Sequence, residues 1–292
     1  MEFHTINSAD KALYDKYVKG DMRSSYNFVT GYIWSGKDTV KICEKDGCLI
    51  ILWDNEKGFG MQYPQGKPEN KAQLIKECCQ YLEERGKKPE FYFLNEADVL
   101  ELKSIMPDAF VFDYDRDNCD YIYDSSKLIS LSGKKLHSKK NHLNSFRRNY
   151  NFRFRRMLQS DIPDCKALFN TWYDEKNGDE KYLEESKTAT FKLLDNIDNL
   201  GLIGGVIEVE GKIIACSVGE RISDDTALIH IEFADRNYSG SYATINQQFV
   251  EHEWSDCLYI NREEDMGDEG LRRAKESYQP IKLINVYSAK LK

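Results

Sequence analysis

Acidic side chains and one histidine recur on and after the strands expected between residues 212 and 265. His230 and Glu232 alternate on one such strand, so their side chains should face the same way. A carboxylate or an imidazole there could take the proton of an attacking amine, and carboxylates could hold an ammonium group. This chemistry suits the transfer of a group to an amine. The candidates for catalysis on this reasoning are Glu220, His230, Glu232, Glu263 and Glu264.

Structural roles stay open for the same residues. A lone strand histidine such as His230 can be a hydrogen-bonded core residue. The acids at 263–265 can also serve as negative charge before the helix expected from Leu271, where they would stabilise its dipole. The spacing contains no metal-binding loop, so no metal site is predicted.

A small-residue loop precedes the helix expected over residues 242–254. Backbone N–H groups at a helix N-terminus bind phosphate oxygens, and glycine lets the backbone come close to them. This predicts a site for a phosphate-bearing cofactor, although an ordinary cap and turn would look the same. The residues concerned are Arg236, Ser239, Gly240, Ser241 and Tyr242.

The segment Lys134–Arg156 contains nine Lys or Arg and no Asp or Glu, in a chain of net charge −8. Its apolar residues share one helical face, which predicts an amphipathic helix docked by its apolar side. The basic side could contact tRNA phosphates, or it could be a solvated face on an acidic body. Asn141 and His142 could instead face inward toward the acidic loop. The substrate-binding candidates are Lys139, Lys140, Asn141, His142, Asn261 and Asp265.

These residues need a strand, a loop, a helix and a second strand to position them. The alternating run 227–233, the helix 242–254 and the apolar run 257–260 supply that order, which in α/β enzymes builds a site at the carboxyl ends of strands. A hairpin over 202–208 and 212–221 precedes it. In the first half, residues 26–34 also look like a strand.

The two halves of the chain share an order of elements without repeating in sequence. Each has a helix, a hairpin, a glycine-containing loop, a helix, a strand, a short helix and closing strands. This order predicts two copies of one α/β unit. The expected domains are residues 1–125 and residues 126–292, with the candidate site in the second.

Two motifs carry a resemblance to a known family. One is Lys139–Asn144 with Phe146 and the strand 152–156, and the other is 261–267 followed by 270–280. The chain resembles soluble proteins related to the C-terminal domain of phosphatidylglycerol lysyltransferases, and its second half resembles the N-acetyltransferase (GNAT) superfamily. This resemblance implies an α/β (α+β) fold with two tandem GNAT-like acyltransferase domains on mixed, mostly antiparallel sheets.

The resemblance also implies an acyl or aminoacyl transferase, with acetyl-CoA or aminoacyl-tRNA as donor and a small-molecule amine as acceptor. Tyr278 occupies the place of the tyrosine that protonates the leaving group in acetyltransferases, although a half-buried aromatic residue would fit too. The superfamily's coenzyme A motif is not matched, because Tyr242 stands where Gly or Ala is expected. The alternative function is a non-catalytic GNAT-like module that binds a small amine, a nucleotide or RNA.

Composition sets outer limits. The chain has 292 residues, 41% hydrophobic and 31% charged, and no run approaches the roughly 18 apolar residues of a membrane span. We therefore expect no integral membrane segment. The eight cysteines show no zinc spacing, so we expect reduced, mostly buried thiols and a cytoplasmic location.

Overall fold

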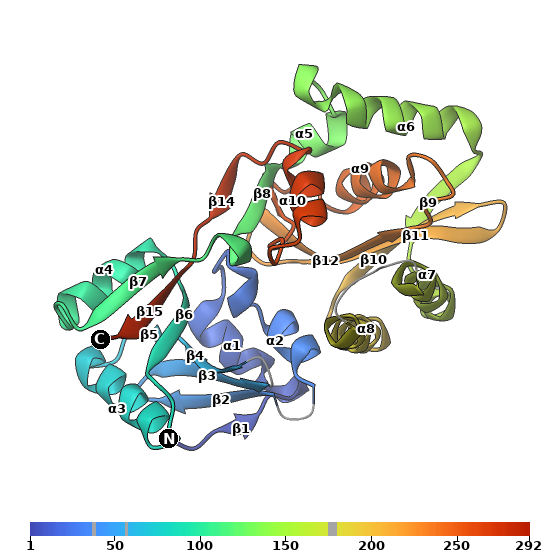
Figure 1. Cartoon of the computed structure of the whole chain (residues 1–292). Helices are drawn as coiled ribbons and strands as arrows, with labels where there is room; N and C mark the ends of the chain where they lie inside the picture. Colours follow the sequence, from blue (N-terminus) through green and yellow to red (C-terminus); the bar gives the residue numbers. More distant parts are fainter. Residues whose placement is uncertain (37–38, 56–57, 175–179) are drawn as a thin grey trace. The chain divides into compact units, whose positions relative to one another are not determined.

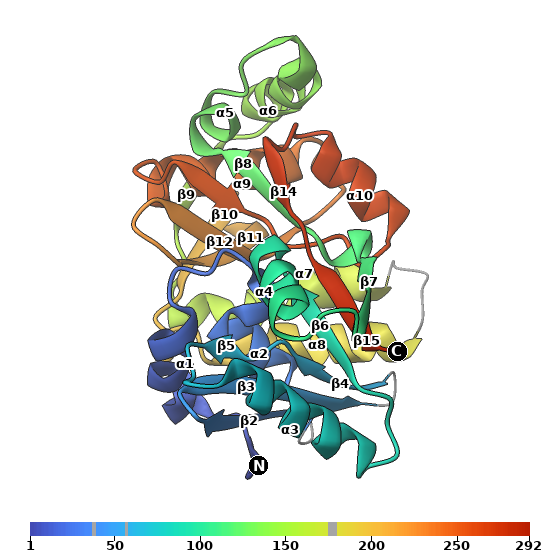
Figure 2. The same ribbon diagram turned by 90° about the vertical axis from the view of Figure 1, so that its left-hand side faces the viewer.

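The computed structural model describes residues 1–36, 39–55, 58–174 and 180–292. The chain forms two compact units, shown in Figures 1 and 2. Unit 1 comprises Met1–Cys119 together with Ile284–Lys292, and unit 2 comprises Asp120–Leu283. Both are mixed α/β, as predicted. Each contains a sheet with antiparallel pairings and a parallel pair.

Unit 1 places its described strands in the order β1-β2-β3-β4-β6-β15-β7, with β5 paired to β3. Its elements are β1 (His4–Thr5), α1 (Lys11–Val18), α2 (Phe28–Trp34), β2 (Val40–Lys45), β3 (Cys48–Asn55), β4 (Gly58–Gln62), β5 (Gln65–Gly66), α3 (Lys71–Glu83), β6 (Glu90–Leu94), α4 (Glu96–Ile105), β7 (Phe110–Tyr114) and β15 (Tyr287–Leu291).

The core of unit 1 follows from the apolar pattern of β3. Ile50 and Leu52 join a cluster with the buried face of α3, where Leu74 and Cys78 are spaced by four. The alternate residues Leu49 and Ile51 are equally buried, so β3 is covered on both faces.

One expected strand of unit 1 is a helix. Residues 28–34 form α2, and the side chain of Asn27 caps it by accepting a hydrogen bond from the backbone N–H of Thr30 at 3.1 Å. The β-branched and aromatic residues of this segment favour a strand locally. The cap and the burial of Phe28, Val29 and Ile33 outweigh that preference.

Unit 2 places its described strands in the order β14-β8-β13-β12-β11-β10-β9. Its elements are β8 (Asp120–Asp124), α5 (Ser125–Ser130), α6 (His137–Asn149), β9 (Phe152–Arg156), α7 (Ile162–Asp174), α8 (Glu180–Asp195), β10 (Ile203–Val209), β11 (Lys212–Arg221), β12 (Thr226–Ala234), α9 (Ser241–Glu253), β13 (Tyr259–Asn261), α10 (Glu269–Glu276) and β14 (Lys282–Ile284).

Helices cover both faces of this sheet (Figure 1). On one face α9 packs against β10, β11 and β12, and α5 and α6 lie over α9. On the other face Phe169 of α7 meets Phe233 of β12 edge to face, with ring centres 4.7 Å apart. The helix α9 is therefore buried along most of its length, including polar residues such as Thr244 and Asn246.

The limits of the two units differ from the expected division at 125/126. The strand β8 pairs with β13, so residues 120–124 belong to unit 2. The last strand, β15, pairs with both β6 and β7, so the chain returns to unit 1 at its end. The segment after α10 accordingly forms two strands, β14 and β15, in different sheets.

All eight cysteines are buried free thiols, as expected. Within the described ranges, no helix is both long enough and apolar enough to span a membrane.

Candidate functional site

The strands β12 and β13 run side by side over three residue pairs, from Thr226 opposite Tyr259 to Leu228 opposite Asn261. Beyond Leu228, β12 continues while β13 ends. Carboxyl ends of adjacent parallel strands are where α/β folds bring polar residues together. In unit 2 the end of this parallel pair gathers most of the residues that the sequence singled out.

A β-bulge in β12 sets the orientation of His230. Val218 lies opposite Ile231 and Gly219 lies opposite Ile229, so His230 is the extra residue. The bulge also breaks the expected alternation. Ile229 joins the core cluster that includes Phe249 of α9, whereas Phe233 packs against α7 on the other face. Ile229 and Phe233, which strict alternation would put on one face, therefore lie on opposite faces of the sheet.

His230 is held between two carboxylates. Its Nδ1 lies 2.9 Å from Oε1 of Glu263 and its Nε2 lies 3.1 Å from Oε1 of Glu220. Its side chain is only 1% exposed. Burial opposes the charged form, but the two carboxylates outweigh it and raise the pKa of His230 to about 9. At neutral pH the imidazolium donates to both carboxylates, which favours a positioning role over that of a general base.

A second buried pair lies two residues further along β12. Oε1 of Glu232 accepts from Nη2 of Arg262, and Oε2 accepts from Nδ2 of Asn246, both at 3.0 Å. Nη1 of Arg262 and Oδ1 of Asn246 are buried and have no hydrogen-bond partner among the described residues. This pair therefore keeps unused hydrogen-bonding capacity.

Tyr278 lies beside this pair. Its ring centre is 4.3 Å from Nζ of Lys139 and 4.7 Å from Cζ of Arg262. Tyr278 is 5% exposed, and burial raises the pKa of its phenol. Burial, and then the nearby guanidinium of Arg262, lower the pKa of Lys139. Lys139 thus reaches this cluster from α6, as a substrate-binding residue would.

The other candidates on α6 face elsewhere. Lys140, Asn141 and His142 are exposed, and Nδ2 of Asn141 contacts Nδ1 of His137 at 3.4 Å on the same helix. The alternative in which Asn141 and His142 face inward toward the acidic loop therefore does not hold. The apolar residues Leu143 and Phe146 take the inward positions instead.

Asn261 and Asp265 hold the acidic loop in place. Both are completely buried. Asn261 donates to Asp120 at 3.1 Å and accepts from the backbone N–H of Glu263 at 2.7 Å. Asp265 accepts from Tyr121 at 2.6 Å and from Arg272 at 2.7 Å. These bonds assign both residues to the loop's structure rather than to contact with a ligand.

The same bonds explain the electrostatics of Asp265. Burial would raise its pKa, but the hydrogen bonds from Arg272 and Tyr121 hold the pKa well below its usual range. Asp265 is therefore a permanently charged anchor.

The side chain of Lys275 on α10 stabilises the acidic loop by binding the loop's backbone. It is 8% exposed, and its Nζ donates to the backbone carbonyls of Arg262 and Glu264. Burial lowers the pKa of Lys275. Burial, followed by repulsion from Glu263 and Asp120, raises the pKa of Glu264 to about 8. A carboxyl group with such a pKa is suited to exchange protons near neutral pH.

The glycine loop packs closely against α6. Gly240 has φ +94°, and a Cβ on it would lie 2.5 Å from the carbonyl oxygen of His142 on α6. The hydroxyl of Ser241 donates to the carbonyl of Asp235 at 2.9 Å. Arg236 and Ser239 are exposed, and Tyr242 is half-buried. The close approach at Gly240 serves helix packing, which favours the cap-and-turn alternative over a phosphate cradle.

Sequence reasoning missed three residues that shape this site: Arg262, Asn246 and Lys275. Arg262 lies in the run 261–265, whose three carboxylates were the residues singled out. Asn246 and Lys275 lie on helices, where a polar side chain is usually solvated. A polar residue on the apolar face of a predicted helix was the available signal for Asn246.

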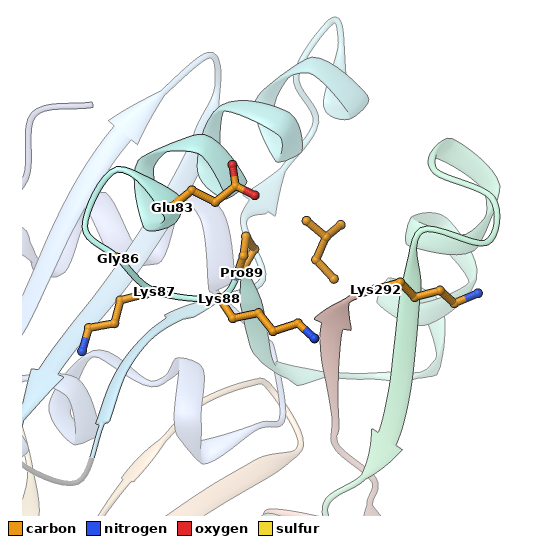
Figure 3. Close-up of a pocket in the computed structure, with 7 residues that line it drawn as sticks. Glu83, Gly86, Lys87, Lys88, Pro89 and Lys292 are labelled. Carbon is orange, nitrogen blue, oxygen red and sulfur yellow. The ribbon is translucent and has the colours of Figure 1, made fainter.

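A surface pocket elsewhere contributes none of these residues. It lies in unit 1, between the end of α3 and the end of β15 (Figure 3). Its lining is Glu83, Gly86, Lys87, Lys88, Pro89, Leu291 and Lys292. Among the described residues, no group of His, Cys, Asp and Glu could hold a metal ion.

Comparisons with known proteins agree with the fold. The family model described as "Phosphatidylglycerol lysyltransferase, C-terminal" matches residues 20–290. A conserved protein of unknown function from Bacteroides thetaiotaomicron is 30% identical, with a TM-score of 0.91 and coverage of 100% of both chains. The C-terminal domain of a candidate lysylphosphatidylglycerol synthetase from Agrobacterium fabrum is 15% identical, with a TM-score of 0.66 over 97% of this chain and 92% of that one.

The tandem architecture has its own counterpart. A tandem GNAT protein from the clavulanic acid biosynthesis pathway has a TM-score of 0.54 at 8% identity, over 99% of this chain and 98% of that one. The predicted fold of two tandem GNAT-like units is confirmed.

Proposed function

Because this chain belongs to the family of the phosphatidylglycerol lysyltransferase C-terminal domain, we propose that it transfers an acyl or aminoacyl group to an amine-bearing acceptor. The observation that carries the proposal is the cluster of buried Tyr278 with half-buried Glu232, Arg262 and Lys139 where β12 and β13 part. The cluster combines a proton donor, cations and a carboxylate partly shielded from bulk water, which strengthens each electrostatic interaction.

The reaction is a direct attack of the amine nitrogen on the acyl carbon. Glu264, whose pKa is about 8, takes the proton from the amine as the new bond forms. Tyr278 gives its proton to the leaving oxygen or sulfur as the old bond breaks. His230 holds the carboxylates of Glu220 and Glu263 in place, and Glu263 acts electrostatically on Glu264.

Aminoacyl-tRNA is the donor that the geometry favours over acetyl-CoA. The carbonyl of His142 lies where a Cβ of Gly240 would stand, so α6 fills this side of the loop, and Tyr242 replaces the Gly or Ala of the coenzyme A motif. The outer face of α6 carries the exposed cations Lys140 and Arg148, which could contact RNA phosphates. We therefore assign tRNA docking to α6 and the aminoacyl end to Tyr278.

Transfer assays test the proposal. Purified protein is incubated with labelled acetyl-CoA or with labelled aminoacyl-tRNAs, each against a panel of small amines. With the substrate pair so found, Glu264→Gln and Tyr278→Phe should each lower kcat by about 100-fold, the usual contribution of a positioned acid or base. Glu269→Gln, an exposed acid on α10, is the matched control. Unchanged turnover in both test variants would refute this assignment.

One observation favours the non-catalytic alternative. The coenzyme A motif of the superfamily is not matched, because Tyr242 stands where Gly or Ala is expected. A binding module would show ligand-dependent thermal stabilisation without turnover, since stabilisation depends on ligand concentration relative to Kd. Product formation in the same samples decides for the enzyme.

A further inference from the structure

Two cations converge on one aromatic ring in unit 2. Lys139 comes from α6 and Arg262 from the loop after β13, yet both lie within 5 Å of the centre of the Tyr278 ring. Like charges that approach each other in a buried place repel, and Arg262 contributes to the lowered pKa of Lys139. Glu232 bonds Arg262 through Nη2, which neutralises part of this charge.

Two atoms in the same cluster have hydrogen-bonding capacity to spare. Nη1 of Arg262 lacks an acceptor and Oδ1 of Asn246 lacks a donor among the described residues. Asn246 is 1% exposed, and the amide orientation is fixed because Nδ2 donates to Glu232. Buried polar atoms are nearly always paired, so two unpaired atoms beside one ion pair indicate that this place receives a polar group.

We infer that Arg262 and Lys139, placed against Tyr278, form a binding site for one anionic oxygen group, a carboxylate or a phosphate. The guanidinium presents its free Nη1 edge, and the ammonium supplies a point charge from a second element. An acidic hydrogen or a hydroxyl on the bound group would satisfy Oδ1 of Asn246. Binding an anion here relieves the repulsion between the two cations.

This inference deepens the proposed function, because it states that one of the two substrates carries an anion beside the reacting atoms. An acceptor amine that also bears a carboxylate or phosphate would place that anion here. A donor nucleotide could supply a phosphate to the same place. The binding itself does not depend on whether transfer occurs, so the two proposals can fail separately.

Titration calorimetry with inorganic phosphate and with acetate tests the site on the full-length protein. We expect at least one anion to bind, and Lys139→Met to weaken it by about tenfold or more. Lys139 is half-buried and methionine keeps much of its stem, so this variant should fold. The matched control is Lys282→Met, an exposed lysine whose Nζ also lies over a tyrosine ring, that of Tyr259 at 5.7 Å. Binding that is absent, or equal in both variants, would overturn the inference.

Carbon-13 NMR of reductively methylated protein gives an independent reading. The resonance missing in Lys139→Met identifies the lysine, and its pKa should rise when phosphate is added, because an anion favours the ammonium form. A pKa that does not respond to phosphate contradicts direct contact.

Competition then identifies which substrate carries the anion. Displacement of phosphate by AMP assigns the site to the donor, and displacement by glycine or phosphoethanolamine assigns it to the acceptor. A phosphate site that none of these compounds enters would refute its assignment to a substrate, whatever the result of the transfer assays.

Discussion

The carbonyl oxygen of His142 lies against Gly240, so close that a Cβ on the glycine would stand 2.5 Å from it. Gly240 also has φ +94°, in the left-handed region that favours glycine. Both facts concern packing between α6 and the start of α9. They explain without a ligand why residue 240 is a glycine. They also fix the position of α6 from which Lys139 contacts Tyr278.

Gly240→Ala should therefore destabilise the protein by about 2–4 kcal/mol, the sum of backbone strain and a forced shift of α6. Gly211→Ala is the control, since Gly211 has φ +80° but a Cβ at that position would meet no atom within 4 Å. It should cost about 1 kcal/mol, from backbone strain alone. Urea unfolding measures both. Equal destabilisation by the two substitutions would show that the approach of His142 to Gly240 contributes nothing to the free energy of unfolding.

Much of unit 2 was predictable because its local patterns agree with its fold. The run 227–233 and the helix 242–254 match β12 and α9 to within one residue at each end. The bulge at His230 was not predictable, since it depends on register with β11. The return of β15 to the first sheet depends on pairing across about 200 residues of sequence, which no local pattern records.

The site divides along the same line. The carboxylates at 263–264 were found because strand ends attract functional residues, and Tyr278 was found through the resemblance to acetyltransferases. The side chain of Lys139 points inward and that of His142 points outward because of how α6 packs on α9. The pattern of one helix does not show which of its charged side chains will contact a residue of another element. Lys275 escaped notice because a lone lysine on a short helix is normally solvated, whereas here it binds two loop carbonyls.

Unit 1 contains a buried ion pair whose removal should be costly. Arg23 is 2% exposed, and its Nη1 donates to Asp98 and to the carbonyl of Phe93, each at 2.6 Å. Phe93 has φ +60°, which is strained for a bulky residue. Arg23→Met should cost about 3–5 kcal/mol, because it leaves the half-buried carboxylates of Asp21 and Asp98 without the guanidinium.

The control for Arg23 is Lys16→Met, which removes an exposed pair with Glu44 and should change stability little. Chemical unfolding of the two variants makes the comparison. A small destabilisation by Arg23→Met would mean that water or a neighbouring donor replaces the guanidinium.

The pH dependence of stability should report the charge on His230. Its pKa is raised from 6.5 to about 9, so its stabilising contribution is complete below pH 6.5 and is lost as pH rises to 9. Wild type should therefore exceed His230→Gln by about 3 kcal/mol more at pH 6 than at pH 9.5. The pKa of Glu264 is raised from 4.5 to about 8, so its contribution to stability is lost as pH rises between those values. Both proteins contain Glu264, so this change largely cancels in the comparison.

Urea unfolding of wild type and His230→Gln at the two pH values measures this difference. A gap that stays constant with pH would show that the imidazole is neutral between Glu220 and Glu263. In that case His230 would return as a candidate for the general base.

The exposed cations of α6 should govern RNA binding if the donor is a tRNA. Lys140 and Arg148 lie on its solvent face, and removing one phosphate-binding cation lowers the slope of log K against log salt by about 1. The double variant Lys140→Glu/Arg148→Glu should therefore bind tRNA at least tenfold more weakly, with a slope reduced by about 2. Lys187→Glu on α8, across the sheet from α6, should leave binding unchanged (Figure 1). Filter binding over a salt series makes the measurement, and equal slopes for wild type and the double variant would place RNA elsewhere or exclude it as the donor.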